Sequence, residues 1–522
     1  MDFLDSMKTA QDNISITENG AVGYKTSGKE LTDFFFRVSS FRTLSDEDVI
    51  KNVLDLKDEY TLKMLFYIRD IREGLGERRL FRLAMKALMQ EDFEGKDEFF
   101  RKTIIRWIPE YGRYDDMFVF MNTSYEEYVI NFIRDQLSED LENCNENKPI
   151  TLLAKWMPSI NTSSKESKEL GRKIASALHL TERDYRKTLS KLRKYNNIVE
   201  RQMCAKEWGE IDYNKVPSKA NLRYANAFMR NDEDRRREYL SKLAVGDKSV
   251  KINAATNFPH DIVHRYMIGT WGGRLKDYDE TLEQLWKNLP STEGLENTIV
   301  VRDGSGSMTT FVGDGSVTCL EVSTALAIYC AERLKDSFKN KFITFSSNPH
   351  IIDLNGLTSL HTKLARVYKE GDCSNTNIER VFDLILHTAK ENNLPQDSLP
   401  KQVLIISDME FDYATTYRSN AYESLFETIS NKYKDCGYTM PKLVFWNVCS
   451  RTGTIPCKEN KAGVLLVSGF SQNVVNMVNT GETDPYLALI RAVDVERYQD
   501  IPLFKLEEKK QSSTSYTSSL EK

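Results

Sequence analysis

Three oxygen-bearing side chains lie two residues apart in the sequence VVRDGSGSM (300–308), directly after a β-branched run. They are Asp303, Ser305 and Ser307, and alternate residues of a loop that leaves a strand can point at one place. Carboxylate, hydroxyl and water oxygens are the ligands that hard cations such as Mg²⁺ prefer. The spacing therefore predicts a site for one divalent cation, Mg²⁺ or Mn²⁺. Two alternatives stay open: a Gly/Ser turn with unrelated acids, and a site that forms but is idle.

Two more oxygen ligands are expected at the same place. Thr376 lies in the loop GDCSNTN before an expected helix, and Asp408 ends the expected strand KQVLIISD. Loops at the carboxyl edge of a parallel sheet lie beside one another, so both residues can join the first three. Glu410 and Asp412 follow Asp408, and they either tune the site or are surface acids.

The elements that must position these residues begin near residue 297, where strand-like runs alternate with helices. The expected strands are NTIVVRD, KNKFITFSS, PHIIDL, KQVLIISD, PKLVFWNV and GVLLVSGF. The expected helices are EVSTALAIYCAERL, NIERVFDLILHTAKENN, AYESLFETISNKYKD and SQNVVNMVN. This alternation predicts a doubly wound, Rossmann-like parallel sheet, which binds ligands at the carboxyl ends of its strands.

Residues 30–290 have a different pattern. Segments such as YTLKMLFYIRDI, RRLFRLAMKALMQ, YEEYVINFIRDQL and YRKTLSKLRKY place apolar residues at i, i+3, i+4 and i+7. No strand alternation is visible, and short polar breaks separate the segments. Many short amphipathic helices in a row predict a HEAT-like α-solenoid, although no clean repeat period is present.

Composition describes an ordinary folded chain. It has 522 residues, a net charge of −5, 40% hydrophobic and 29% charged residues, which exclude a fibrous or mostly disordered protein. No stretch approaches a membrane span, and the first ten residues, MDFLDSMKTA, have no apolar core of a secretory signal. The eight cysteines are scattered without a Cys-x-x-Cys pair, as expected for reduced thiols in the cytoplasm. We therefore expect a helical domain at 1–295, an α/β domain at 296–506, a disordered Ser/Thr-rich tail at 507–522 and a cytoplasmic location.

One segment is strongly basic within this acidic chain. Residues 151–230 carry 17 Lys and Arg against 8 Asp and Glu. A basic face of this kind attracts polyanions, of which nucleic acid is the usual one, and the alternative is a solvated helical surface. The candidate RNA-binding residues are Arg72, Arg78, Arg79, Arg172, Lys173, Arg186, Lys187, Lys191 and Lys194.

Several of these signals have a structural alternative of their own. The arginines of 69–82 flank a Gly-x-Gly turn, and ion pairs with Asp70, Glu73 and Glu77 would make them a capped helix hairpin instead. Trp156 and Tyr185 could stack on bases, but core packing is the favoured interpretation. His260 and His264 resemble half of a zinc pair without a third ligand, so core or capping roles are favoured.

The five cation-site positions resemble the metal-ion-dependent adhesion site of von Willebrand factor type A domains. The resemblance implies that Ser305, Ser307 and Thr376 ligate the ion directly or nearly so. It implies that Asp303 and Asp408 act largely through bound water, and that one coordination position stays open for an acidic group of a partner.

A helical solenoid followed by a type A domain resembles the TROVE/Ro family of RNA-binding proteins. Stretches such as RDIREGLGERRLFR (69–82), AKWMPSINTSSK (154–165), IDYNKVPSKA (211–220) and NFPHDIV (257–263) look like an uncharacterised branch of it. The resemblance implies a ring of helical repeats that binds small noncoding RNA or misfolded RNA ends, with the α/β domain closing the ring.

The leading hypothesis is thus a non-enzymatic, monomeric RNA-binding protein whose type A domain holds Mg²⁺ or Mn²⁺ and docks a partner. The second is a protein-interaction scaffold that uses the metal site to bind a partner's acidic group. A third, a metal-dependent hydrolase, has little support because no base is evident near a single ion.

Overall fold

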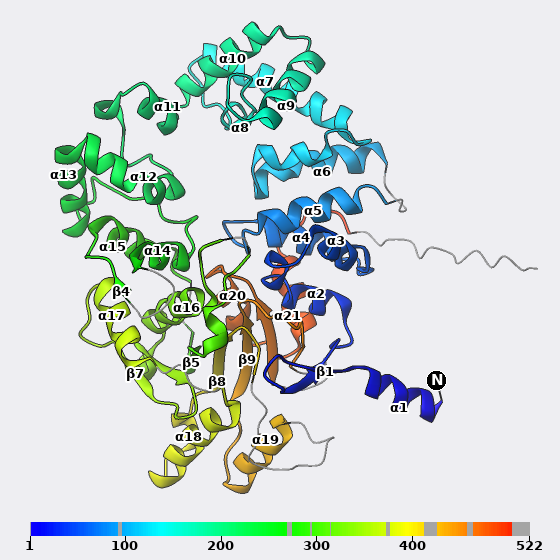
Figure 1. Ribbon diagram of the computed structural model, residues 1–522, viewed down its shortest axis with the longest axis vertical. Helices are drawn as coiled ribbons and strands as arrows, with labels where there is room; N and C mark the ends of the chain where they lie inside the picture. The colour runs from blue at the N-terminus through cyan, green and yellow to red at the C-terminus, as the bar shows by residue number, and fades with distance from the viewer. Residues whose placement is uncertain are drawn as a thin grey trace, which may run out of the picture.

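The structure is a computed structural model that describes residues 2–91, 97–268, 274–292, 295–313, 315–371, 376–411, 425–456 and 463–503. The tail expected to be disordered, 507–522, lies outside these residues, as does Asp412. The chain combines a helical amino-terminal part with a carboxyl-terminal sheet that is mostly parallel (Figure 1).

The amino-terminal part consists of short helices and two small hairpins. Its elements are α1 (Phe3–Asp12), β1 (Ile14–Ile16), β2 (Val22–Tyr24), α2 (Glu30–Phe36), α3 (Asp46–Leu54), α4 (Thr61–Arg69), α5 (Arg78–Leu88), α6 (Glu98–Tyr111), α7 (Glu126–Asn145), α8 (Leu153–Trp156), α9 (Lys165–Ala177), α10 (Glu182–Tyr195), α11 (Val199–Cys204), α12 (Ser218–Asn231), α13 (Glu233–Ala244), α14 (Pro259–Tyr266), β3 (Met267–Ile268), β4 (Arg274–Leu275) and α15 (Glu280–Lys287).

Helix α10 shows why these segments are helical. The hydroxyl of Thr181 accepts a hydrogen bond from the Asp184 backbone N–H and so caps the first turn. Tyr185, Leu189 and Leu192 recur at helical spacing and are buried. The expected series of amphipathic helices is confirmed, while its description as a HEAT-like solenoid stays a prediction.

The carboxyl-terminal part alternates strands and helices. Its elements are β5 (Thr298–Asp303), α16 (Cys319–Arg333), β6 (Lys341–Phe345), β7 (Ile351–Asp353), α17 (Leu360–Glu370), α18 (Ile378–Glu391), β8 (Gln402–Ser407), α19 (Leu425–Asp435), β9 (Lys442–Asn447), β10 (Val464–Ser468), α20 (Val474–Asn479) and α21 (Pro485–Val493). Six of the strands form one sheet in the order β10-β9-β8-β5-β6-β7.

Both faces of this sheet are covered. Successive residues of β5 belong to different hydrophobic clusters: Val300 packs with residues of α16, and Val301 packs with residues of α18. All six residues of β5 are therefore buried, which explains why the strand reads as an apolar run and not as an alternation. The expected alternation of strands and helices around a mostly parallel sheet is confirmed.

Two expectations need correction. Strand β7 pairs antiparallel with β6, because the two are joined by a short turn and a parallel pair would need a long crossover. The helical half also contains strand pairing, in the two-residue hairpin β3–β4 and in the earlier hairpin β1–β2. These strands are too short to show a period of two in the sequence.

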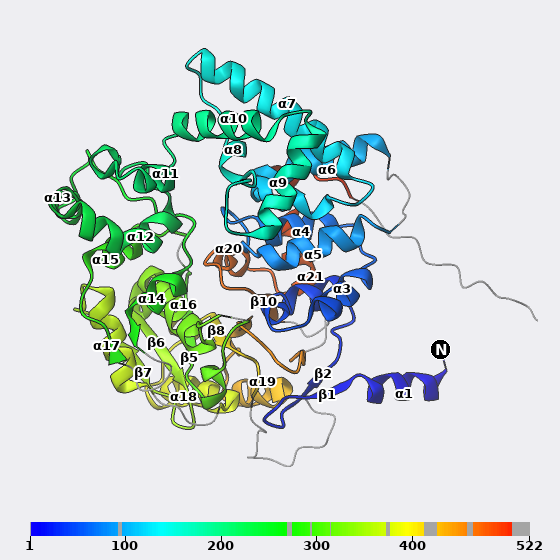
Figure 2. The same ribbon diagram turned by 45° about the horizontal axis from the view of Figure 1, so that its top comes forward.

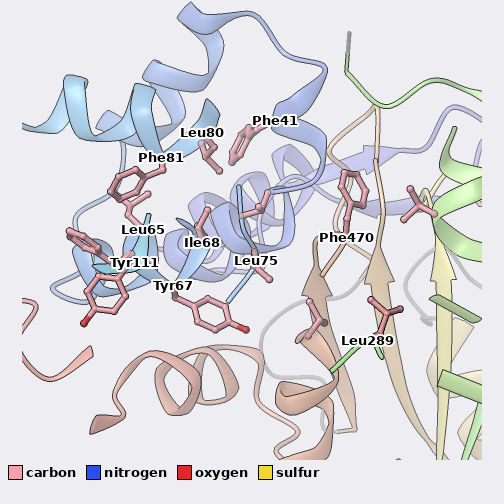
Figure 3. Packing of buried hydrophobic residues seen from close by; sticks show 14 of the residues in the cluster. Phe41, Leu65, Tyr67, Ile68, Leu75, Leu80, Phe81, Tyr111, Leu289 and Phe470 are labelled. Atoms are coloured by element: carbon pink, nitrogen blue, oxygen red, sulfur yellow. The ribbon is translucent and has the colours of Figure 1, made fainter. Parts of the chain in front are cut away.

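The helices form an arc that begins and ends on the sheet part (Figures 1 and 2). At one end α2 packs against β10 and α21, and α4 also contacts α21. At the other end α14 packs against α16, and α15 contacts α17. One hydrophobic cluster runs across the first junction, where Leu75 of the helical part lies near Phe470 of the sheet part (Figure 3).

Candidate functional sites

The candidate metal centre lies where the strand order of the sheet reverses. From β5 the chain moves outward to β6 and β7, then returns to β8 on the other side and continues to β9 and β10. Asp303 ends β5 and Asp408 directly follows β8, so both carboxylates stand at the carboxyl ends of the two central strands. Open α/β sheets bind their ligands at such a crossover point.

Hydrogen bonds fix the carboxylate of Asp303 in this place. The backbone N–H of Ser305 donates to Oδ1 at 2.9 Å, and the hydroxyl of Ser407 donates to Oδ2 at 2.5 Å. The hydroxyl oxygens of Ser305 and Ser307 are 3.0 Å apart. Asp303 is fully buried, whereas Ser307 is partly exposed. The loop therefore places two hydroxyls between a buried acid and the solvent.

Asp408 is also fully buried. Its Oδ1 accepts from the backbone N–H of Glu410 at 3.2 Å, and its Oδ2 accepts from Nη1 of Arg451 at 3.0 Å. The intervening Met409 has φ of 63°, in the left-handed region that a non-glycine residue seldom adopts. Asp408 and Glu410 both contact Arg451, the first through the guanidinium and the second through the backbone N–H.

The two acids repel each other in a region that excludes water. Burial, and next the charge of Asp408, raise the pKa of Asp303 to about 7. Burial also raises the pKa of Asp408, although Arg451 opposes this effect. A pair of buried carboxylates with two hydroxyls nearby is a suitable set of oxygen donors for a hard divalent cation, which would relieve the repulsion.

Thr376 is buried and directly precedes Asn377, whose side chain caps α18. Helix α18 leads into β8 and lies antiparallel to it, so its first residues are at the carboxyl edge of the sheet. The structure thus brings four of the five predicted ligands together by direct contacts or charge interactions, and it places Thr376 at the same edge.

Sequence reasoning missed Arg451 and the role of Glu410. Glu410 is buried, and its Oε1 accepts from the backbone N–H groups of Arg451 at 2.8 Å and Thr452 at 2.9 Å. Both residues follow parallel strands, Glu410 after β8 and Arg451 after β9. The expected strand PKLVFWNV was a usable signal, because residues that follow it must also reach this edge.

Helix α10 carries the clearest basic surface. Opposite its buried stripe lie Arg183, Lys187 and Lys194, which are all exposed. Lys191 is exposed beside them, and its Nζ donates to Oδ1 of Asn145 at 2.6 Å. In the described part of the chain, none of these four side chains is in ion-pair contact with a carboxylate.

The other predicted RNA-binding residues of this region have local partners. Arg172 forms an ion pair with Glu182 at 3.0 Å, and Lys173 forms one with Glu126 at 2.6 Å. Arg186 is exposed, and its Nε donates to the backbone oxygen of Glu182 at 3.4 Å. The expected basic face therefore exists, and its least neutralised part is the outer side of α10.

The arginines around the α4–α5 turn are held in ion pairs. Arg78 contacts Asp115 at 2.5 Å and Asp116 at 3.2 Å. Arg79 contacts Asp46, and Arg72 contacts Glu110 at 3.2 Å. This arrangement favours the alternative of an ion-paired helix hairpin, although the acids lie elsewhere in the chain than expected.

The aromatic and histidine candidates also have defined surroundings. Tyr185 is fully buried, and its hydroxyl donates to the backbone oxygen of Pro158, so the core-packing interpretation holds. Trp156 is half-buried, with the guanidinium of Arg113 3.9 Å from its ring centroid. His260 is buried, and His264 contacts Glu321 and Ser316, each at 3.0 Å.

The described residues lack two features. They contain no group of three or more His, Cys, Asp or Glu side chains that could hold a metal ion, so the candidate centre depends on its hydroxyls. Within the same described ranges, no helix is long and apolar enough to cross a membrane.

Comparison with known proteins gives two family matches. Residues 125–292 match a model described as a domain of unknown function (DUF2828). Residues 297–518 match another, described as a domain of unknown function (DUF7788). Neither description states an activity.

Among curated proteins, the chain is similar to "Uncharacterized protein L728" of Acanthamoeba polyphaga mimivirus. The two are 28% identical over 522 residues, which cover 92% of this chain and 87% of the viral protein. Among solved structures, the chain is similar to the crystal structure of the Deinococcus radiodurans RO (RSR) protein, with a TM-score of 0.45 and 11% identity. That similarity covers 88% of this chain and 99% of the other, but a TM-score this low assigns neither fold nor function.

Proposed function

We propose that the protein is a non-enzymatic, monomeric, cytoplasmic RNA-binding protein that holds small noncoding or misfolded RNA on its helical half. In this proposal residues 1–295 form a TROVE-like helical-repeat domain, and residues 296–506 form a type A domain. The observation that carries the proposal is the outer face of α10, where Arg183, Lys187 and Lys194 face solvent without a carboxylate partner among the described residues.

A row of unneutralised cations suits a phosphate backbone. Lys and Arg that contact phosphates release condensed counterions, which gives binding that weakens steeply with salt. Successive positions 187, 191 and 194 follow the helix axis for about 10 Å, since each residue rises about 1.5 Å. This length spans about two to three phosphates of one nucleic-acid strand.

The first test is to purify the full chain from cells at low salt and to sequence the RNA that comes with it. A Lys187→Glu/Lys191→Glu/Lys194→Glu variant is purified in parallel. The expected result is enrichment of defined small RNAs with the native chain and their loss with the variant. Equal RNA recovery from both chains, or none above background, contradicts the proposal.

A second function, docking of an acidic partner group at a metal centre, has its own supporting observation. Asp303 and Asp408 are both buried, and the hydroxyls of Ser305 and Ser307 lie between Asp303 and solvent. In this proposal Ser305, Ser307 and Thr376 hold Mg²⁺ or Mn²⁺ directly, and the two acids hold it largely through water. The bound ion would supply a positive charge with one open position for a partner's carboxylate.

Calorimetric titration of the full chain with Mn²⁺ tests the second function. Ser305→Ala/Ser307→Ala is expected to weaken Mn²⁺ binding at least tenfold, because it removes two oxygen ligands and leaves the carboxylates in place. Ser241→Ala, on the exposed side of α13, is the control and should leave the affinity unchanged. Equal Mn²⁺ affinity of native chain and double variant contradicts the metal assignment.

A further inference from the structure

The amino-terminal hairpin lies across the loops that follow β8 and β9. Tyr24 and Ile455 exchange backbone hydrogen bonds of 2.9 and 2.8 Å, and the hydroxyls of Ser15 and Thr454 are 2.9 Å apart. Figure 2 shows β1 and β2 beside the sheet part, while α1 extends away from the body. The hairpin thus reaches the edge of the sheet that carries the candidate metal centre.

The tip of the hairpin is bound through three consecutive residues. The hydroxyl of Thr17 donates to the backbone oxygen of Phe411 at 2.7 Å. The backbone N–H of Glu18 donates to Oε2 of Glu410 at 2.8 Å, and the amide of Asn19 donates to the backbone oxygen of Glu410 at 2.6 Å. The tip itself is a turn, in which the backbone N–H of Gly20 donates to the backbone oxygen of Thr17 at 3.0 Å. The contacts therefore involve both the backbone and the side chains of a turn.

The carboxylate of Glu18 completes the contact. Its Oε2 accepts from Nε of Arg451 at 2.7 Å and also contacts Nη2, while Nη1 of the same guanidinium donates to Asp408. One guanidinium thus bridges an acid of the hairpin to an acid of the candidate metal centre. The positive charge of the guanidinium favours a carboxylate over a neutral amide at this position, because hydrogen bonds between ionised groups are stronger than neutral ones.

Little apolar surface anchors the hairpin. The side chains of Ile14, Ile16 and Val22 are 43%, 59% and 63% exposed. A two-stranded hairpin is marginally stable alone, so this one depends on its polar contacts with the body. A segment that buries few apolar side chains opens at a lower free energy than the core.

We propose that the surface formed by Glu410, Phe411 and Arg451 is a docking site for an acidic turn of a partner protein. The hairpin tip Thr17–Asn19 occupies this site from within the same chain. A partner segment with a Glu or Asp at the position of Glu18 displaces the hairpin by pairing with Arg451. The charge of Arg451 sets the specificity, since its other side is already committed to Asp408.

This inference goes beyond the second proposed function, because it places the acidic group of the partner on Arg451. It differs from that function in one respect: the acidic group binds a guanidinium and not the ion. A chelator therefore distinguishes the two.

The first measurement is hydrogen exchange of residues 13–24 in full-length chains. The native chain is compared with a Thr17→Ala/Glu18→Ala/Asn19→Ala variant and with Arg491→Met, which removes an arginine that pairs with Glu482 elsewhere on the surface. Protection of the hairpin is expected to fall at least tenfold in the triple variant and to stay unchanged in Arg491→Met. Unchanged protection in the triple variant overturns the claim that the tip contacts hold the hairpin.

The second measurement is binding of a fluorescent peptide with the sequence of residues 13–24 to the triple variant. We expect saturable binding of this peptide. Its affinity should fall at least tenfold when Gln replaces Glu in the peptide, and also when the triple variant carries Arg451→Met in addition. Thermal unfolding checks that each variant folds, and Arg451→Lys, which keeps the charge, should bind more tightly than Arg451→Met.

Three outcomes overturn the proposal. The first is equal affinity for the peptides with Glu and with Gln. The second is the absence of saturable binding to a chain whose hairpin has opened. The third is binding that EDTA abolishes and that Arg451→Met does not affect. The last outcome would leave the metal-centred function standing, whereas binding that persists in EDTA and needs Arg451 supports the inference whether or not an ion is held.

Discussion

Reversal of three charges on α10 is the sharpest perturbation of the proposed RNA surface. Lys187, Lys191 and Lys194 are exposed and have no carboxylate partner among the described residues, so Lys→Glu at these positions removes up to three phosphate contacts. For single strands the slope of log affinity against log salt changes by about 0.7 for each phosphate neutralised. The slope of the triple variant should therefore be shallower by about 2.

The size of this effect is measurable. A fourfold rise in salt, from about 50 to 200 mM, should cost the native chain about 20-fold more affinity than the variant. Fluorescence anisotropy with a labelled single-stranded RNA, recorded at four salt concentrations, gives both slopes. The folded state should survive, since exposed substitutions usually change the free energy of unfolding by less than about 0.5 kcal/mol each.

A matched control separates local contacts from net charge. Lys339→Glu/Lys369→Glu/Lys390→Glu reverses three exposed lysines of the sheet part, and two of these lie in last turns of helices, as Lys194 does. Both variants carry the same net charge, so general repulsion affects them equally. The assignment of RNA binding to α10 is wrong if the salt dependence of RNA affinity falls equally in the control and the α10 variant. It is also wrong if the salt dependence falls in neither.

Three further predictions concern stability and metal. Asp116 is fully buried within hydrogen-bond reach of three arginines. Asp116→Ala should therefore lower the free energy of unfolding, measured in urea, by about 3–5 kcal/mol. A loss below about 1 kcal/mol would refute the buried network. Burial lowers the pKa of His260 from 6.5 to about 3, so the unfolded state takes up the extra proton and stability falls as pH drops from 6.5 toward 3. The fall should be about 1.4 kcal/mol per pH unit from this group and should be absent in His260→Phe, compared by urea unfolding at pH 6.5 and 4.5. Mn²⁺ at 100 times its dissociation constant should raise the free energy of unfolding by about 2.7 kcal/mol in the native chain and not in Asp303→Ala, measured by thermal unfolding with and without EDTA.

The elements themselves were largely predictable. Apolar runs such as KQVLIISD and helical spacings such as YRKTLSKLRKY report local periodicity, and β8 and α10 form where those patterns stand. The hairpin β1–β2 was not predicted, because three-residue strands are shorter than the periodicity that would reveal them. Its existence depends on contacts with residues more than 400 positions away.

The candidate metal centre was predictable from the Asp-x-Ser-x-Ser spacing and from Asp408 at a strand end, because a parallel sheet brings all its carboxyl ends to one edge. The contact between Glu18 and Arg451 beside this centre was not predictable, since the two residues are separated by most of the chain. The same holds for the arginines of the α4–α5 turn. Their type and spacing suited RNA, but folding places Asp115 and Asp116 against them.

There is a physical reason why the elements were predictable from the sequence and the contacts of charged side chains were not. Periodicity of apolar residues is a property of neighbours in the chain, so element type and the strand-end position of Asp303 follow from the amino-acid order alone. Whether a charged side chain faces solvent or a partner depends on which distant segments pack beside it. Lys187 and Arg78 look alike in the sequence. The packing of α5 against the 3-10 helix Tyr114–Phe120 pairs Arg78 with Asp115, whereas Lys187, on the outer side of α10, has no carboxylate partner among the described residues.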